Sequence, residues 1–251
     1  QLGSLEAQKE RWGEAESSFK AALQIDPNLA SAHMHLGAVL SHEQQPVRAV
    51  AEMSRAAELD PKNANVQVEW GNGLGASGDD GDAITHYQQA MTLDAGYADA
   101  EYQEALALQR LGRSGEAVPL FRKVAAARPK EAEPLINLGL ALVQTGQAKE
   151  AIPLYLRAVR LDPKNPSIYL NLGAAYLQES DIDDAIRQLQ AGLKIAAESP
   201  LLHYDLGLAY KLKDDMPDAI RELETTIRIA PDSPDAPYTL GILYMQGGRF
   251  D

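Results

Sequence analysis

Three of the five histidines lie within a short stretch, and histidine is the side chain that most often binds transition metals and exchanges protons near neutral pH. They are His33, His35 and His42. On one helix, His33 and His35 point about 200° apart, while His35 and His42 are separated by about 10 Å along the axis, so no two of them can share a metal ion. We therefore expect no metal site here, and we expect His33 to occupy a packing position.

A glycine-rich stretch, Gly73-Leu-Gly75-Ala-Ser-Gly78, matches the spacing of a dinucleotide-binding loop. Such a loop works only between a β-strand and the N-terminus of a helix, where its glycines let a pyrophosphate approach the backbone. The surrounding pattern is helical, so we expect no nucleotide site. Together with Gly71, these glycines lower the helix propensity of the segment, which leads to the hypothesis of a flexible joint.

The run Asp79-Asp80-Gly81-Asp82 offers carboxylates for calcium. A calcium loop, however, needs glycine at its sixth position and glutamate at its twelfth, and this chain has Ile84 and Ala90 there. Acidic residues before a helix also stabilise its dipole, which is the interpretation we prefer. Hydrolase, zinc-protease and Walker motifs are missing from the sequence. We therefore predict a protein that is not an enzyme and has no catalytic residue, cofactor or metal ion.

The net charge of the chain limits the classes of partner that it can bind. The chain has 23 Lys+Arg and 36 Asp+Glu, a formal net charge of −13, which disfavours binding to nucleic acid. No stretch approaches 18 consecutive apolar residues, so we expect a soluble protein without membrane insertion. The absence of cysteine suits the cytoplasm and the periplasm equally, and leaves the compartment unknown.

The elements that position these residues repeat with a period of 34 residues. Leucine–glycine pairs recur at this period or its multiples, at Leu2-Gly3, Leu36-Gly37, Leu138-Gly139, Leu172-Gly173, Leu206-Gly207 and Leu240-Gly241. An alanine follows twelve residues after each glycine position, at Ala15, Ala49, Ala83, Ala117, Ala151, Ala185 and Ala219. Each unit contains two apolar patterns with helical spacing, such as the one over 149–161, so the sequence predicts two closely packed helices per unit.

This unit resembles the tetratricopeptide repeat (TPR), as Leu172-Gly173-x-x-Tyr176 followed by Ala185 illustrates. The resemblance implies an all-α, right-handed superhelical solenoid of antiparallel helix pairs. It divides a single array over 1–251 into a partial repeat at 1–29, complete repeats at 30–63, 64–97, 98–131, 132–165, 166–199 and 200–233, and a partial repeat at 234–251. Because neither end carries a polar capping element, we expect a fragment of a longer protein.

In such arrays the first helix of each repeat lines a concave surface. In the C-terminal half, this surface combines apolar residues, which can bury peptide side chains, with amides, which can bond to a peptide backbone. In glycosyltransferase-associated arrays of the family, asparagines placed like Asn137 and Asn171 hold peptide backbones. We therefore expect a peptide-binding groove formed by Ile136, Asn137, Leu140, Val143, Gln144, Leu170, Asn171, Leu177, Gln178, Tyr204, Asp205, Leu208 and Lys211.

The resemblance implies a non-catalytic scaffold that binds a peptide or protein segment. Family members that hold C-terminal carboxylates use lysines and arginines from three successive first helices. Here the corresponding face carries Glu69, Glu133 and Asp205, so we expect a neutral or basic partner. Two alternatives remain: a substrate-recognition array of a larger enzyme such as a glycosyltransferase, and a scaffold that self-assembles into a homo-oligomer.

Overall fold

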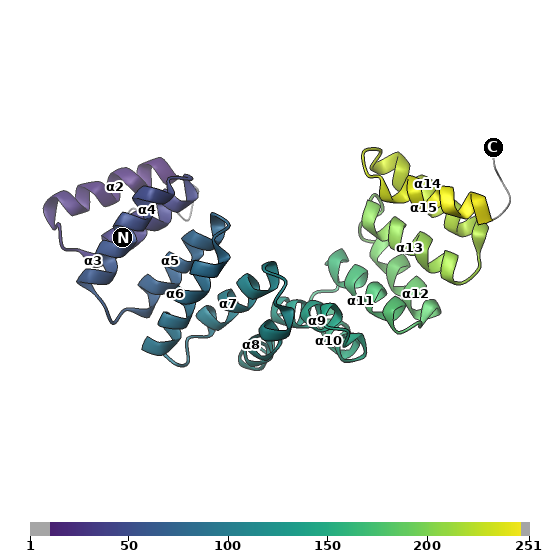
Figure 1. Ribbon diagram of the computed structural model, residues 1–251, viewed down its shortest axis with the longest axis horizontal. Helices are drawn as coiled ribbons and strands as arrows, with labels where there is room; N and C mark the ends of the chain where they lie inside the picture. Colours follow the sequence, from purple (N-terminus) through teal and green to yellow (C-terminus); the bar gives the residue numbers. More distant parts are fainter. Residues whose placement is uncertain (1–10, 247–251) are drawn as a thin grey trace. The chain divides into compact units, whose positions relative to one another are not determined.

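The computed structural model describes residues 11–246, and within this range all regular secondary structure is helical, as the sequence predicts (Figure 1). The chain divides into two compact units, Gln1–Ala127 and Arg128–Asp251. Unit 1 contains α2 (Trp12–Ile25), α3 (Ala30–His42), α4 (Pro46–Leu59), α5 (Ala64–Ala76), α6 (Asp80–Leu93), α7 (Ala98–Arg110) and α8 (Ser114–Ala127). Unit 2 contains α9 (Glu133–Gln144), α10 (Ala148–Leu161), α11 (Pro166–Gln178), α12 (Ile182–Leu193), α13 (Pro200–Leu212), α14 (Met216–Ile229) and α15 (Asp235–Gln246).

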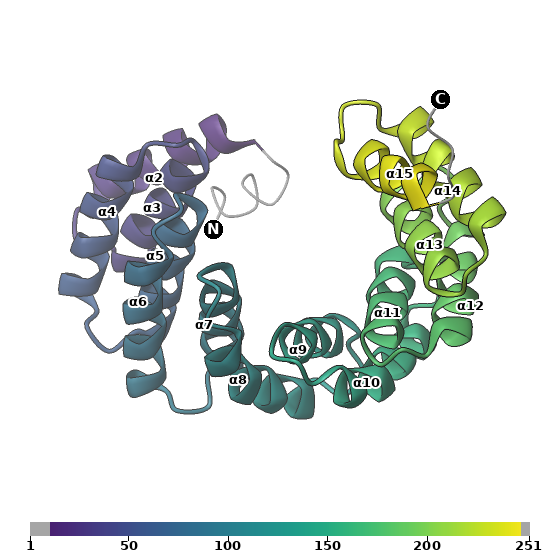
Figure 2. The ribbon, with the colours of Figure 1, turned by 45° about the vertical axis from the view of Figure 1, so that its right-hand side comes forward.

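Each complete 34-residue repeat forms two helices, and the pattern over 149–161 corresponds to α10. Within unit 2, α9, α11 and α13 are first helices of successive repeats, and α11 contacts both of the others. Figure 2 shows α9 and α11 on one side of this unit and their second helices, α10 and α12, on the other. None of the helices within residues 11–246 combines the length and the apolar character needed to span a bilayer.

The core of each repeat is built from a small residue facing a large one. The alanine column predicted from the sequence is buried, with exposed fractions of 0 to 3%. Four residues after these alanines, large side chains such as Tyr87, Phe121 and Tyr155 are fully buried. Burial of one such side chain stabilises the fold by about 1.5–3 kcal/mol, so the two columns hold each helix pair together.

The turn between the two helices of a repeat has the same backbone geometry in all six complete repeats. One residue per turn adopts a positive φ, and these residues are spaced by 34: Gln44, Gly78, Gly112, Gly146, Ser180 and Asp214. Glycine adopts this conformation without steric cost, whereas the side chains at the other three positions make it less favourable. The turn geometry is therefore set by the packing of the helices and is only partly encoded by glycine.

Successive repeats are joined by a hydrogen bond from the first helix of one repeat to the end of the preceding repeat, which we call the inter-repeat clip. His33 Nε2 donates to the Pro27 carbonyl at 3.0 Å, and His203 Nε2 donates to the Ala197 carbonyl at 3.0 Å. Tyr169 donates its hydroxyl to the Pro163 carbonyl at the same distance. The clip therefore fixes three junctions between repeats with two different side-chain types.

Candidate functional site

The glycine-rich and acidic motifs of unit 1 have structural roles. Gly73 and Gly75 lie inside α5, and Gly78 lies in the turn that follows, with no β-strand anywhere in residues 11–246. Asp80 is buried and accepts hydrogen bonds from Arg110 Nε at 2.9 Å and Arg110 Nη2 at 2.6 Å. This pairing ties the start of α6 to the end of α7, and it raises the pKa of the Arg110 guanidinium.

The three clustered histidines turn toward different partners. Besides its clip, His33 places Nδ1 2.6 Å from Glu52 Oε2 on α4. His35 stacks on Phe19, and His42 stacks on Trp12 with ring centroids 3.8 Å apart. Within residues 11–246, no three His, Cys, Asp or Glu side chains are grouped so that they can hold a metal ion. These histidines therefore serve packing between helices.

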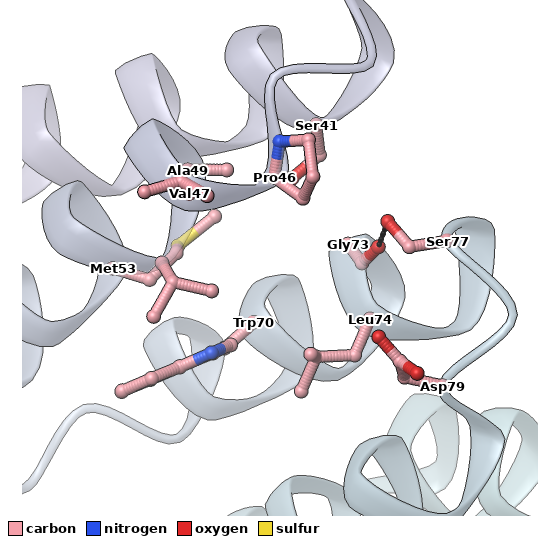
Figure 3. Close-up of a pocket in the computed structure, with 11 residues that line it drawn as sticks. Ser41, Pro46, Val47, Ala49, Met53, Trp70, Gly73, Leu74, Ser77 and Asp79 are labelled. Atoms are coloured by element: carbon pink, nitrogen blue, oxygen red, sulfur yellow. Dashed lines mark hydrogen bonds between the residues drawn. The ribbon is translucent and has the colours of Figure 1, made fainter.

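An apolar pocket of about 320 Å³ lies between α4 and α5 in unit 1 (Figure 3). Val50 on its wall is 40% exposed, whereas at the same repeat position Ile84 and Ile186 are buried and Val118, Ile152 and Ile220 are partly buried. The second helix and the following first helix are therefore less tightly packed here. The pocket is lined by Ser41, Pro46, Val47, Ala49, Val50, Met53, Trp70, Gly73, Leu74, Ser77 and Asp79.

The glycines of α5 explain part of this packing. A Cβ on Gly73 would lie 2.5 Å from Ser41 Oγ, so glycine lets α5 approach α3 closely. A Cβ on Gly71 would meet the Tyr87 ring at 2.5 Å. The glycines thus allow close helix contacts, and α5 is continuous through them. The hypothesis of a flexible joint stays a prediction.

All thirteen groove residues predicted from the sequence lie on first helices of unit 2, and we call this surface the first-helix face. Gln144 and Gln178 are exposed, and the other eleven are partly exposed, so none of the thirteen is buried. Leu170, Leu177 and Tyr204 also pack against a buried cluster that includes Leu202 and Leu206. These three therefore support the core as well as the surface, which their apolar character alone did not distinguish.

Asn137, Asn171 and Asp205 occupy the same position in three successive repeats, one residue before the recurring Leu-Gly pair. They lie on α9, α11 and α13, which contact one another in this order. All three side chains are partly exposed. We call them the polar row of the first-helix face.

Asp205 differs from the two asparagines because its side chain is ionisable and only accepts hydrogen bonds when it is charged. Burial raises its pKa to about 6, and no charged group contributes to the shift. Within residues 11–246, no hydrogen bond or ion pair reaches this carboxylate. At the same repeat position in unit 1, burial also raises the pKa of Glu69, but there a hydrogen bond from Asn72 opposes the rise. Leu208 stands where Asn72 would be, which explains why Asp205 lacks such a bond.

A second hollow lies at Tyr204 of the first-helix face and was not found from the sequence. A pocket of about 170 Å³ is lined by Pro200, Leu201, Tyr204, Thr226, Ala230, Ser233 and Asp235. Leu201 on its wall is 62% exposed, and Tyr238 on α15 is 74% exposed. Ile136, Leu170, Tyr204 and Tyr238 follow one another at intervals of 34 residues. The repeat spacing therefore could have predicted that the face continues to α15.

Comparison with known families identifies the repeat. Models described as "Tetratricopeptide repeat" match residues 6–68 and 170–234, and a model described as "TPR repeat" matches residues 139–180. Among curated proteins, no relative matches this sequence.

Solved structures of similar fold include two that are described as TPR proteins. YrrB, described as a TPR protein with an unusual peptide-binding site, is 25% identical, with a TM-score of 0.64 over 74% of this chain and 96% of YrrB. MamA (41-end) from Desulfovibrio magneticus RS-1 is 23% identical, with a TM-score of 0.64 over 68% of this chain and 97% of that one. The C-terminal part of a TPR repeat-containing protein from Cytophaga hutchinsonii is 15% identical, with a TM-score of 0.74 over 95% and 98% of the two chains.

The 34-residue period, the paired helices and the small-against-large core agree with these matches, and the three family models together cover more than half of the chain. The chain belongs to the tetratricopeptide repeat family.

Proposed function

We propose that this chain is a non-catalytic scaffold that binds an extended protein segment along the first-helix face of unit 2. One observation carries this proposal: three successive first helices present partly exposed apolar side chains beside a polar row in the same register. Membership of a family of protein-interaction scaffolds supports it, as does the peptide-binding site named for YrrB.

The chemistry of the face fits an extended chain. Ile136, Leu140 and Val143 follow one stripe of α9, because residues three and four apart lie on the same side of a helix. An amide such as Asn137 or Asn171 both donates and accepts hydrogen bonds, and so matches the N–H and C=O groups of a peptide backbone. Packed helices are about 8–10 Å apart and an extended peptide rises about 3.3 Å per residue, so the polar row would meet every third residue.

The net charge of the chain favours a neutral or basic segment. Its two ionisable groups of opposite sign are Asp205 and Lys211, while the whole chain carries a net charge of −13. An acidic segment would be repelled at long range, since like charges slow encounter and lower affinity.

The proposal is tested by selection from a displayed library of random twelve-residue peptides with the purified chain as bait. A triple variant, Asn137→Ala, Leu140→Glu and Asn171→Ala, removes two amides of the polar row and one apolar contact. A matched control, Leu161→Glu, places the same new charge at an exposed leucine at the end of α10. Circular dichroism and urea unfolding establish that all three proteins are folded before selection.

Peptides retained by the wild-type chain and by Leu161→Glu, but lost by the triple variant, are the expected result. Peptides retained equally by all three proteins, or by none, would overturn the proposal. Light scattering with size-exclusion chromatography is run in parallel on the wild type and triple variant. A dimer that only the triple variant loses would assign the face to self-assembly and overturn the proposal.

A further inference from the structure

At the third position of the polar row, Asp205 has a carboxylate where Asn137 and Asn171 have amides. Asn137 and Asn171 each carry a donor and an acceptor, whereas an ionised carboxylate only accepts. It therefore repels the carbonyl oxygens of a peptide backbone, which an asparagine would bind. A group that offers only donors, and carries positive charge, is the complement of this site.

The surroundings of Asp205 contain no cation that already fulfils this role. Lys211 is six residues after Asp205 on α13, which places it about 9 Å from Asp205 along the helix axis and about 120° from it around the axis. On α14, Glu222 is paired with His203 and Arg221, so these three groups satisfy one another. A metal ion would need several protein ligands, and no suitable group of three occurs within residues 11–246.

Partial burial of Asp205 increases the strength of an ion pair at this site. Asp205 follows Tyr204 on α13, and Tyr204 lines the pocket of about 170 Å³ between α13, α14 and α15, whose lining also includes the carboxylate of Asp235. A cation at Asp205 can also contact a tyrosine ring, and attraction between charges is stronger where water is excluded. The neighbouring pocket has room for an apolar side chain of the same segment.

We propose that Asp205 binds a lysine or arginine side chain of the segment bound on the first-helix face, with an adjoining apolar residue in the pocket beside Tyr204. This inference rests on the proposed function and adds the partner's chemistry: a peptide with a basic residue next to an apolar one. The basic residue lies about three positions from the residue that contacts Asn171.

The test compares the wild-type chain with Asp205→Asn and with a control, Asp214→Asn. Asparagine at 205 keeps the shape and restores the amide of the polar row. Asp214 is exposed, has a φ of 65°, and lies in the turn after α13, a conformation that asparagine also tolerates. The two variants therefore remove the same charge, one on the first-helix face and one away from it.

Each protein selects peptides from the twelve-residue library. One peptide selected by the wild-type chain is then synthesised in two forms, with lysine or with norleucine at its basic position, because norleucine lacks the charge. Wild type and Asp214→Asn are expected to enrich lysine or arginine at one position beside an apolar residue. Replacing lysine by norleucine is expected to weaken binding at least about tenfold for these two proteins, and less than about threefold for Asp205→Asn.

The outcomes separate the inference from the proposed function. Peptides that bind the first-helix face but show no basic position would overturn the role of Asp205 and leave the proposed function intact. If norleucine weakened binding equally for all three proteins, this would also overturn the role of Asp205 and leave the proposed function intact. No bound peptide with any of the proteins would overturn both proposals.

Discussion

Gly139 on α9 lies directly against the ring of Tyr155 on α10. A Cβ on residue 139 would be 2.6 Å from Tyr155 Cζ, closer than any unstrained contact. Tyr155 is fully buried, so its ring has no free space into which it can move. The distance between these two helices therefore depends on glycine at 139.

We predict that Gly139→Ala lowers the free energy of unfolding by about 1–3 kcal/mol, because the added methyl group must displace the ring or the helix. Gly241 occupies the same repeat position on α15, and no described atom lies within 4 Å of a Cβ placed there. Gly241→Ala should raise stability by up to about 1 kcal/mol through helix propensity. Urea unfolding measures both, and equal effects of the two substitutions would contradict the packing argument.

Tyr155 and Tyr87 share one repeat position but differ in their hydroxyl groups. Tyr87 donates to Asn72 Oδ1 at 3.1 Å, whereas the Tyr155 hydroxyl is buried without a described hydrogen-bond partner. Burial raises the pKa of both phenols. Phe121 fills the same position and is fully buried, so the position accepts phenylalanine.

We expect Tyr155→Phe to stabilise the chain by about 1 kcal/mol, because it removes an unsatisfied buried hydroxyl. Tyr87→Phe should destabilise it by a similar amount through loss of its hydrogen bond. Thermal unfolding of the two single variants decides the matter, and a loss of stability in Tyr155→Phe would show that its hydroxyl has a partner.

The turn residues with positive φ give a reciprocal pair of substitutions. Ser180 has a φ of 64°, and Gly146 has a φ of 77° at the same position one repeat earlier. Ser180→Gly should stabilise the chain by about 1 kcal/mol, and Gly146→Ser should destabilise it by about the same amount, because only glycine adopts this conformation without steric cost. Denaturant midpoints of the two variants measure the effect; shifts in the same direction would count against it.

Asp205 should make stability depend on pH in an identifiable window. Its pKa of about 6 in the folded chain lies above the ordinary value of 3.8, so the folded state holds the proton more tightly than the unfolded state. The contribution of this group to stability therefore falls as pH rises from about 4 to about 6, and stays unfavourable above that.

Asp205→Asn removes this penalty, so we predict a gain of at most about 3 kcal/mol at pH 7.5, with the gain shrinking toward pH 4. The difference between the unfolding free energies of wild type and variant, measured across this range, isolates the residue from the other carboxylates. A difference that does not change with pH would show that the folded chain does not raise the pKa of this carboxylate.

The repeat spacing was sufficient to predict the fold. Alanines such as Ala151 and large residues such as Tyr155 recur in fixed register, and packing between adjacent repeats requires this register, so local pattern and tertiary structure coincide. The same spacing placed the thirteen residues on accessible surfaces of α9, α11 and α13. Their role in binding stays a prediction.

Features that depend on a single contact between repeats were not predictable. The pocket between α4 and α5 arises where Gly73 meets Ser41, two residues 32 positions apart whose contact no local pattern records. The isolation of Asp205 depends on leucine rather than asparagine at 208, which is visible in the sequence only once the repeat geometry is known. Similarly, Leu170 and Tyr204 fit a surface pattern but also pack against the core.

The inter-repeat clip has a consequence for how the chain opens. In unit 2, Tyr169 and His203 link three consecutive repeats, so amide hydrogens over 132–233 should exchange with solvent through one shared opening event. In unit 1 the clip forms at His33, whereas Gln67 and Glu101 take its position in the next two repeats but bond to His86 and Lys123. The junction between the repeats at 30–63 and 64–97 has no clip, so these two repeats should exchange at separate rates. The polar row lies on this linked segment of unit 2, so its three side chains should stay in register until the whole segment opens.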